Sequence, residues 1–414
     1  MKPPKIIWFN PGVENASGFH KTHKAFVQIE NDLETLMLFT SEERDTVLLN
    51  KQYDKAYFDY LKSHGFNLPS VEIKNDFKAS KKEYSFTECA PWGWGPDSFE
   101  FVKHKIRVND LPEAELSHLV EINSKSFARK LSLLLCDEFP EEVCNKFYCG
   151  VECANGEGVE NAIKEFNSNG CVELVAKAPY GTAGRGFKLI DKASSMQNVL
   201  SWCEQILKTQ KTIIVEPWVE RKKDFSILFD YKEGECKTIG VTEMIINKQG
   251  GYKGCWLNVD GLDELVSGNL FNKINQLLRD EFKAHVNALK SLPFSLDGFV
   301  FKDCDHKSAL RVISEFNFRM SMGRVAHMII EKVAANKCAM FRILNISSLN
   351  SADKKRIYIH HKMEINQSKW SEGICFLTPI LKNTKFCAIM IVSSNKNNVL
   401  QLFDKLCCRY NIKK

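Results

Sequence analysis

The stretch FKDCDHKSALRVISEFNFRMSMG, residues 301–323, spaces acidic and amide side chains in a way that suits a metal site. Asp303 lies near the end of one predicted strand. Glu315, Asn317 and Arg319 occupy every second position of the next strand, so their side chains point to one face of a sheet. Two carboxylates and an amide supply the hard oxygen ligands that Mg²⁺ prefers. The pattern predicts a magnesium site with Asp303, Glu315 and Asn317 as ligands.

Arg319 lies on the same predicted face as these ligands. A guanidinium there stabilises charge on a transferring phosphoryl group or on an acyl-phosphate oxygen, which predicts a catalytic role. A salt bridge between Glu315 and Arg319 on a polar sheet face is the structural alternative. Because Lys302 directly precedes Asp303, the strand register, and with it the acidic ligand, stays open by one residue.

A second motif, VAKAPYGTAGRGF at residues 175–187, puts glycines between two apolar runs. Glycine lets backbone amides approach anionic oxygens closely, so Gly181, Gly184 and Gly186, with Arg185 among them, are predicted to bind phosphates. Lys177, just before the loop, is placed to contact the α- or β-phosphate as a point charge. The loop leads into a strand and lacks Gly-Lys-Ser/Thr, so it is no P-loop, and a plain tight turn is the structural alternative.

The segment VEPWVERKKDFS, residues 215–226, reads as a strand that breaks into an extended connector. Such a connector can hydrogen-bond an adenine edge through its backbone, which points to Trp218 and Val219. Glu216 and Asp224 are the carboxylates near the connector, where a carboxylate can hydrogen-bond the ribose hydroxyls of the nucleotide. A surface turn with solvated charges is the alternative.

Length and composition frame these motifs. A chain of 414 residues with 44% hydrophobic and 26% charged residues is typical of a globular protein with two or three domains. No apolar run reaches the roughly 20 residues of a membrane helix, and the first residues lack the pattern of a secretory signal. The net charge of +6 is mild and no basic block alternates with aromatics, so we expect no nucleic-acid partner and no membrane partner.

The fifteen cysteines are scattered, so we expect them to be reduced in a cytoplasmic protein. Cys144, Cys149 and Cys153 come nearest to a metal cluster, but they lack the paired CxxC knuckles of structural zinc sites and are read as buried hydrophobes. The tryptophans of PWGWGP, residues 91–96, are interpreted either as packing on the core or as one wall of a binding site.

Periodicity predicts an α/β chain with α+β lobes. Strands over 5–10, 45–50 and 70–73 alternate with helices in a small N-terminal domain, and long helices are expected over 113–139 and 263–290. Strands are predicted over 298–303, 309–319 and 356–365, and a polar glycine-rich connection over 248–256. The predicted boundaries are 1–112, 113–215, 216–334 and a mixed extension over 335–414.

In this order the motifs resemble the ATP-grasp superfamily of ATP-dependent carboxylate ligases, over roughly residues 115 to 330. The resemblance implies an ATP-grasp fold behind a Rossmann-like N-terminal domain. It adds Lys125, in NSKSFARKL, as a first phosphate-binding lysine beside Lys177. Ser124 stands where the family has Asp, so Arg129 and Lys130 are alternative contacts.

The resemblance implies a ligase that uses ATP and Mg²⁺, or Mn²⁺, to phosphorylate a small-molecule carboxylate. An amine or thiol then displaces phosphate, while the glycine loop closes over the nucleotide. The resemblance also implies a homodimer. Phosphotransfer to a small molecule, as in kinases of this fold, is the alternative, followed by a non-catalytic nucleotide-binding protein. Four basic residues are candidates for holding the substrate carboxylate: Lys253, Arg311, Arg324 and His327.

Overall fold

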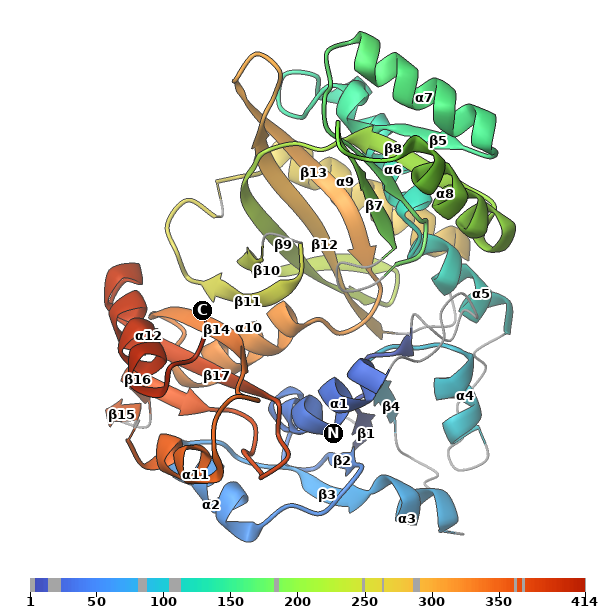
Figure 1. Ribbon diagram of the computed structural model, residues 1–414. Coiled ribbons are helices and arrows are strands. Elements are labelled where there is room, and N and C mark those ends of the chain that lie inside the picture. Colours follow the sequence, from blue (N-terminus) through green and yellow to red (C-terminus); the bar gives the residue numbers. More distant parts are fainter. Residues whose placement is uncertain are drawn as a thin grey trace.

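The computed structural model describes most of the chain in three sheets with their helices (Figure 1). It describes residues 4–13, 24–80, 88–103, 113–181, 186–247, 250–262, 264–285, 291–360, 363–366 and 369–413. None of the helices in these ranges is both long enough and apolar enough to cross a bilayer.

The N-terminal domain is a parallel sheet with the strand order β3-β2-β1-β4, which confirms the expected Rossmann-like α/β unit. Its elements are β1 (Lys5–Trp8), α1 (Lys24–Leu33), the 3₁₀ helix η2 (Glu34–Thr40), β2 (Thr46–Leu49), α2 (Lys55–Ser63), β3 (Ser70–Ile73), α3 (Lys74–Ala79), β4 (Glu88–Pro91) and α4 (Pro96–Val102). Two neighbouring parallel strands cannot be joined by a tight turn, because the chain must cross back to the end at which the first strand began. Helices supply these crossovers and pack on the sheet.

Two helices, α5 (Glu113–Ile122) and α6 (Lys125–Glu138), replace the single long helix expected over 113–139. The break lies at Ser124, whose hydroxyl accepts a hydrogen bond from the amide of Phe127 at 3.1 Å. A serine in that position satisfies an otherwise unpaired amide, so it starts a new helix. The cap places Lys125 in the first turn of α6.

A small antiparallel sheet, of order β5-β8-β6-β7, follows. Its elements are the 3₁₀ helix η3 (Lys146–Cys149), β5 (Val151–Cys153), α7 (Gly156–Ser168), β6 (Leu174–Lys177), β7 (Phe187–Ile190), α8 (Met196–Gln210) and β8 (Ile213–Pro217). Helices α7 and α8 pack together against it and enclose a core of their own (Figure 1).

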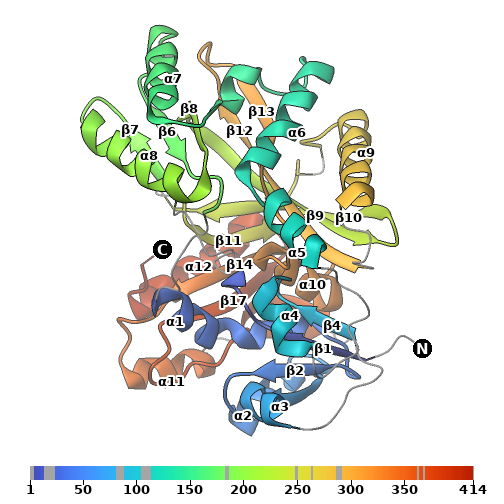
Figure 2. The ribbon, with the colours of Figure 1, turned by 90° about the vertical axis from the view of Figure 1, so that its right-hand side faces the viewer.

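The largest sheet has nine strands in the order β13-β12-β9-β10-β11-β14-β17-β16-β15, all paired antiparallel. Its first part comprises β9 (Arg221–Lys232), β10 (Glu235–Ile246), β11 (Tyr252–Leu257), α9 (Gly268–His285), β12 (Ser291–Lys302) and β13 (Ser308–Asn317). Helices α6 and α9 cover one face of this part (Figure 2). Residues 252–257 are thus a strand, although the sequence predicted a connection there; α9 ends at His285, and 286–290 lie outside the described residues.

The C-terminal residues continue the same sheet. They form α10 (Met322–Val333), β14 (Cys338–Asn345), α11 (Ser351–His360), β15 (Met363–Asn366), β16 (Lys369–Phe376), β17 (Phe386–Ser393) and α12 (Lys396–Tyr410). The strand expected over 356–365 is wrong in its first half, because Ser351–His360 is helical. An apolar alternation over so few residues fits a turn or two of helix as well as a strand.

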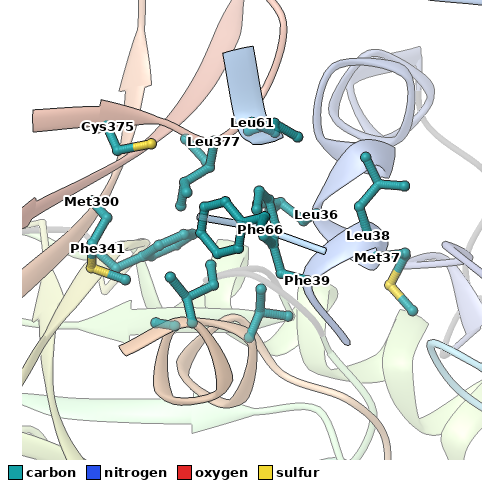
Figure 3. Close-up of a cluster of buried hydrophobic side chains, with 14 of the residues drawn as sticks. Leu36, Met37, Leu38, Phe39, Leu61, Phe66, Phe341, Cys375, Leu377 and Met390 are labelled. Carbon is teal, nitrogen blue, oxygen red and sulfur yellow. The ribbon is translucent and has the colours of Figure 1, made fainter. Parts of the chain in front are cut away.

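The N-terminal domain and the C-terminal strands share one hydrophobic core (Figure 3). Leu36 and Phe39 of η2 and Phe66 meet Phe341 of β14 and Met390 of β17 in this cluster. The hydroxyl of Tyr57 also donates a hydrogen bond of 2.7 Å to the carbonyl of Leu377. The N-terminal domain and the C-terminal strands therefore pack against each other, and a cavity lies between them and strands β9 to β13.

Candidate functional site

The cavity has a volume of about 530 Å³ and lies over the polar face of the large sheet. The opposite face of the sheet packs against the apolar core beneath α6 and α9. The sheet therefore separates an apolar side from a polar one. The N-terminal domain contributes Pro11, Ile29, Leu33 and Trp92, and the C-terminal segment contributes Ile343, Asn345 and Phe386. Strands β9 to β13 and the residues directly after β13 supply the remaining polar floor, which includes Asp224, Ser226, Thr242, Ser295, Asp297, Glu315, Asn317 and Arg319.

Asp297 of β12 and Glu315 of β13 are paired across the two strands, and Ser295 is paired with Asn317. The Asn317 amide donates to Asp297 Oδ2 at 3.0 Å. Removal from water, and then the negative charge of Glu315, raises the pKa of Asp297 to about 7. Two facing carboxylates and an amide oxygen are a donor set for a divalent cation, which would relieve this repulsion.

Asp303 is not part of this constellation. It lies in the turn that joins β12 to β13, where its Oδ1 accepts hydrogen bonds from the amides of Asp305 (3.0 Å) and Lys307 (2.8 Å). It is six residues beyond Asp297, which at about 3.3 Å per residue puts it roughly 20 Å along the hairpin. The predicted convergence of Asp303 with Glu315 is therefore wrong. In this hairpin, residues next to the turn pair with each other, as Lys302 does with Ser308, whereas Glu315 lies far from the turn and pairs with Asp297. A shift by one residue to Lys302 does not change this.

Lys125 links the carboxylate pair to the glycine loop. Its Nζ lies 3.0 Å from Glu315 Oε1 and 3.1 Å from the carbonyl oxygen of Gly181. The two alternatives are engaged elsewhere: Arg129 donates to the carbonyl of Gly150, and Lys130 pairs with Glu281 on the surface. Of the three cations, Lys125 is the one brought to the predicted metal ligands.

Arg319 lines the cavity beside Asn317. Its Nη2 donates to Asn317 Oδ1 at 2.8 Å and its Nη1 to the carbonyl of Met320 at 3.1 Å. The backbone of Gly93 approaches closely, since a Cβ added there would lie 3.1 Å from the Cβ of Arg319. The PWGWGP loop thus combines both interpretations, because Trp92 lines the cavity while Trp94 packs on Trp8.

Lys177, Glu216 and Arg311 form a buried ion cluster. Glu216 accepts from Lys177 through Oε1 and from Arg311 through Oε2, the latter at 2.7 Å. Burial opposes the charge on Glu216, but the two cations lower its pKa to about 2. Removal from water lowers the pKa of Lys177 to about 8 despite Glu216. The cluster holds two positive charges and one negative, so Lys177 retains attraction for an anion.

The glycine motif forms the β6–β7 hairpin, as the sequence predicts, with the Ala178 amide bonded to the Gly186 carbonyl at 2.8 Å. Gly186 has φ +80°, and a Cβ there would lie 3.1 Å from Gly181 Cα. Glycine is needed at this position because other residues rarely adopt that conformation. Gly184 and Arg185 lie outside the described residues.

The connector after β8 borders the same region. The Trp218 amide donates to the Glu173 carbonyl at 2.9 Å, and its ring stacks on Phe187 of the hairpin. Asp224 lines the cavity and pairs with Arg221 at 2.9 Å. Val219 packs against the core under α6 and α9. The connector therefore runs from the glycine hairpin to the cavity floor.

Comparison with known proteins agrees with this architecture. No family model matches the chain. Over their whole length, the described strands and helices resemble a biotin carboxylase bound to an ATP analogue from Campylobacter jejuni (TM-score 0.54, 10% identity, 100% of this chain and 92% of that one). They also resemble N5-carboxyaminoimidazole synthetase with ADP from Staphylococcus aureus (TM-score 0.51, 9% identity, 99% and 98%). The chain has the ATP-grasp fold.

A curated relative extends this likeness to the sequence. The chain is 27% identical over 234 residues to the [butirosin acyl-carrier protein]--L-glutamate ligase of Niallia circulans, a match that covers 56% of this chain and 52% of the relative. The ATP-grasp chain described here thus spans about half the length of the curated relative.

Asp297 is the site residue that sequence reasoning missed. The strand predicted over 298–303 begins one residue after Asp297. In the structure β12 runs through Pro293, and Gly298 sits at an irregularity in the β12–β13 register. A Cβ at Gly298 would lie 2.5 Å from the Val312 carbonyl oxygen. The signal in the sequence was the Asp297-Gly298 pair. A glycine within a strand often marks a β-bulge, so the strand could have been extended through Gly298 to include Asp297.

The four basic residues predicted to hold the substrate carboxylate lie in different parts of the structure. Lys253 lines the cavity. Arg311 belongs to the ion cluster with Glu216, and Arg324 pairs with Asp230 at 2.6 Å. The His327 ring lies against the backbone of Gly240 in β10.

Proposed function

We propose that the protein is an ATP-dependent ligase that joins a carboxylate substrate to an amine, or a thiol, through an acyl phosphate. The observation that carries this proposal is the set of Asp297, Glu315, Asn317 and Arg319 in one cavity, with Lys125 bridging to the glycine hairpin. Support comes from the relative, whose name describes a ligase acting on L-glutamate, and from structural neighbours with ATP-related ligands.

The triphosphate would lie between the glycine hairpin and the floor of the cavity. Lys125 and Lys177 would attract the phosphates, and the amides around Gly181, Gly184 and Gly186, together with Arg185, would cover them. Glu216, already bonded to Lys177 and Arg311, would position Lys177 rather than contact adenine itself. Because the Trp218 amide is occupied, the backbone contacts to adenine fall to the Trp218 carbonyl and the Val219 amide, with Asp224 toward the ribose.

Asp297, Glu315 and Asn317 would hold Mg²⁺, or Mn²⁺. The fit rests on the pairing of Asp297 with Glu315 across β12 and β13 and on the contact of Asn317 with Asp297. Burial first, and then the charge of Glu315, raises the pKa of Asp297, and a divalent cation would offset both effects. When bound, a divalent ion neutralises charge on the phosphates. Arg319, on the same wall, would stabilise negative charge on the transferring group.

The reaction then needs only positioning and charge stabilisation. A carboxylate oxygen attacks the γ-phosphorus and ADP leaves. The amine attacks the acyl carbon, phosphate leaves, and the amine loses a proton. The buried hydroxyls of Thr242 and Ser295 face this cavity without hydrogen-bond partners among the described residues, and are available to the reactants.

The other end of the cavity is suited to the non-reacting part of a substrate. Ile29, Leu33, Ile343 and Phe386 line the cavity with apolar surface, and Lys253 adds a positive charge to its lining. A small carboxylate or amine with an apolar group would fit there. The relative's name places one substrate on an acyl-carrier protein, so carrier-bound as well as free substrates belong in a screen.

The test is incubation with ATP, Mg²⁺ and pairs of carboxylates and amines, free or on a carrier protein. Phosphate release and product mass are measured together. A ligase yields ADP, free phosphate and an amide, and Glu315→Ala abolishes all three. The exposed Glu364→Gln serves as the matched control and retains activity. A phosphorylated product without an amide would establish the kinase alternative and overturn the ligase.

We also propose that the protein is cytoplasmic and forms a homodimer. All fifteen cysteines are free, which suits the reducing cytoplasm. A homodimer is expected from the resemblance, and light scattering of the purified chain measures it directly.

A further inference from the structure

Three cysteine sulfurs meet next to the buried ion cluster. Cys136 lies on α6, Cys149 ends η3, and Cys144 lies between these elements. Their Sγ atoms all lie within 4.8 Å of one another, and Cys136 and Cys149 are 3.6 Å apart. All three are buried, with at most 7% of each residue exposed. Cys153, which the sequence grouped with Cys144 and Cys149, lies instead in the core of the small sheet, so Cys136 takes its place.

The main chain fixes this convergence independently of the sulfurs. The Cys144 amide donates to the Leu310 carbonyl of β13 at 2.8 Å. Arg129 of α6 donates to the Gly150 carbonyl, directly after Cys149. Helix α6 also packs on β13. The three thiols are therefore held together by the fold before any bond forms among them.

The spacing matches a thiolate metal site better than a disulfide. Zn–S bonds of about 2.3 Å place the sulfurs of a tetrahedral site about 3.8 Å apart. A disulfide instead brings two sulfurs to about 2.05 Å and leaves the third without a role. Ser132 Oγ, also buried, lies 3.3 Å from Cys149 Sγ, near enough to be the fourth corner. Among the described residues no other three His, Cys, Asp or Glu side chains meet in this way.

We propose that Cys136, Cys144 and Cys149 bind one Zn²⁺ ion as thiolates, with Ser132 Oγ as the fourth ligand. Uptake is a proton exchange without redox change: three S–H bonds release three protons to solvent and three Zn–S bonds form. Zn²⁺ with three thiolates carries one negative charge, which the guanidinium of Arg311 offsets. Arg311 is buried and donates to the carbonyl of Tyr148, the residue before Cys149, so its charge lies beside the site.

A zinc ion at this site would restrict the motion of the backbone segments that hold the ion cluster of Lys177, Glu216 and Arg311. It would tie α6 to the segment that carries Tyr148, whose carbonyl accepts from Arg311 Nη1 at 2.9 Å. Arg311 in turn holds Glu216, and Glu216 holds Lys177. The zinc site is separate from the cavity and does not depend on the proposed ligase activity.

The experiment measures metal in the full-length protein, expressed in zinc-supplemented medium and purified without chelator under argon. Inductively coupled plasma mass spectrometry is expected to find one zinc per chain in the wild type and in Cys153→Ser. Cys153 is the matched control, since it is comparably buried and its sulfur lies in the core of the small sheet, 3.8 Å from the Val151 carbonyl oxygen. Cys149→Ala and Cys136→Ser are expected to lose the zinc. Co²⁺ added to metal-free wild type should give the intense visible bands of tetrahedral thiolate coordination.

Folding is followed in parallel by circular dichroism, and Ser132→Ala provides a milder variant that keeps all three thiols. It should retain the cobalt–thiolate absorption but bind zinc more weakly. Zinc removal should lower the melting temperature of wild type and Cys153→Ser. Wild type without zinc and without cobalt–thiolate bands overturns the proposal, as does equal zinc content in folded Cys149→Ala. A Cys136–Cys149 disulfide as the stable state, detected as the loss of two hydrogens by non-reducing mass spectrometry, overturns it too.

Discussion

Asp297 shows how one position acquires its chemistry from a neighbouring strand. Burial of its carboxylate, and then the negative charge of Glu315 on the opposite strand, raise its pKa to about 7. Lys125 is bonded to Glu315, and both Asn317 and Ser226 are hydrogen-bonded to Asp297. A side chain in this state gains more from a cation than an exposed aspartate does.

Substituting Asp297 and Asp303 separately distinguishes a metal ligand from a residue that stabilises the turn. Asp297→Asn is expected to lower ligase turnover by at least about 100-fold, because one cation ligand loses its charge. Asp303→Asn keeps the turn's acceptor oxygen and should leave turnover within about twofold. Steady-state rates at varied Mg²⁺ measure both. Equal losses in the two variants would contradict the assignment of Asp297.

The pH dependence of nucleotide binding follows from Lys177. Its pKa, lowered by burial to about 8, means that the amine is charged at pH 7 and mostly neutral at pH 9. Because only the charged form attracts phosphates, ATP affinity should fall by up to about tenfold between these pH values. Calorimetry in matched buffers measures it. Lys177→Arg should remove most of the change, since arginine stays charged; a flat wild-type profile would show that Lys177 does not contact the phosphates.

At the scale of elements, the β11–β14 pairing joins the half of the sheet formed by β9 to β13 to its C-terminal half. Gly254 lies at this junction, with φ +153° and a notional Cβ only 2.0 Å from the Phe341 carbonyl oxygen. Residue 254 is paired with Arg342. Any side chain there would push the two strands apart.

Gly254→Ala should therefore reduce the free energy of unfolding by about 2–4 kcal/mol. Gly268→Ala is the matched control, because nothing lies within 4 Å of its notional Cβ and it starts α9. It should change stability by less than about 1 kcal/mol. Urea denaturation measures both. Similar values for the two variants would mean that the strands can separate at this junction without loss.

At the scale of the whole molecule, the N-terminal domain depends on the C-terminal strands. The shared core contains η2 and α2 residues together with β14, β16 and β17 residues. The indole of Trp370 also donates to the His64 carbonyl at 2.8 Å. We therefore expect these two ends of the chain to unfold together and not as separate domains.

Leu377→Ala tests this coupling. Leu377 is fully buried in the shared core, and its truncation should lower the unfolding free energy by about 2–5 kcal/mol and shift the transition of both ends. Leu381→Ala, with the residue 41% exposed, should stay within about 0.5 kcal/mol. Calorimetry with tryptophan fluorescence follows the transition. A change confined to the C-terminal strands would disprove the coupling.

Local patterns in the sequence indicated the strands of the N-terminal sheet, the glycine hairpin and the acidic motif of β13, but not β11 or the helix over 351–360. These features depend on residues close in the chain: alternation sets which side chains share a face, and glycine sets where the backbone turns. The order of these motifs was enough to indicate the ATP-grasp fold. For the same reason, Glu315, Asn317 and Arg319 were correctly predicted to lie together.

Tertiary structure alone decided which distant residues join them. Strand pairing is long-range, so only the register of β12 on β13 places Asp297 and not Asp303 opposite Glu315. The same holds for Arg311, which reaches Glu216 across 95 positions of the chain, and for Cys136, which replaces Cys153 beside Cys149. A side chain's partners follow from the three-dimensional path of the backbone, and no local spacing encodes that path.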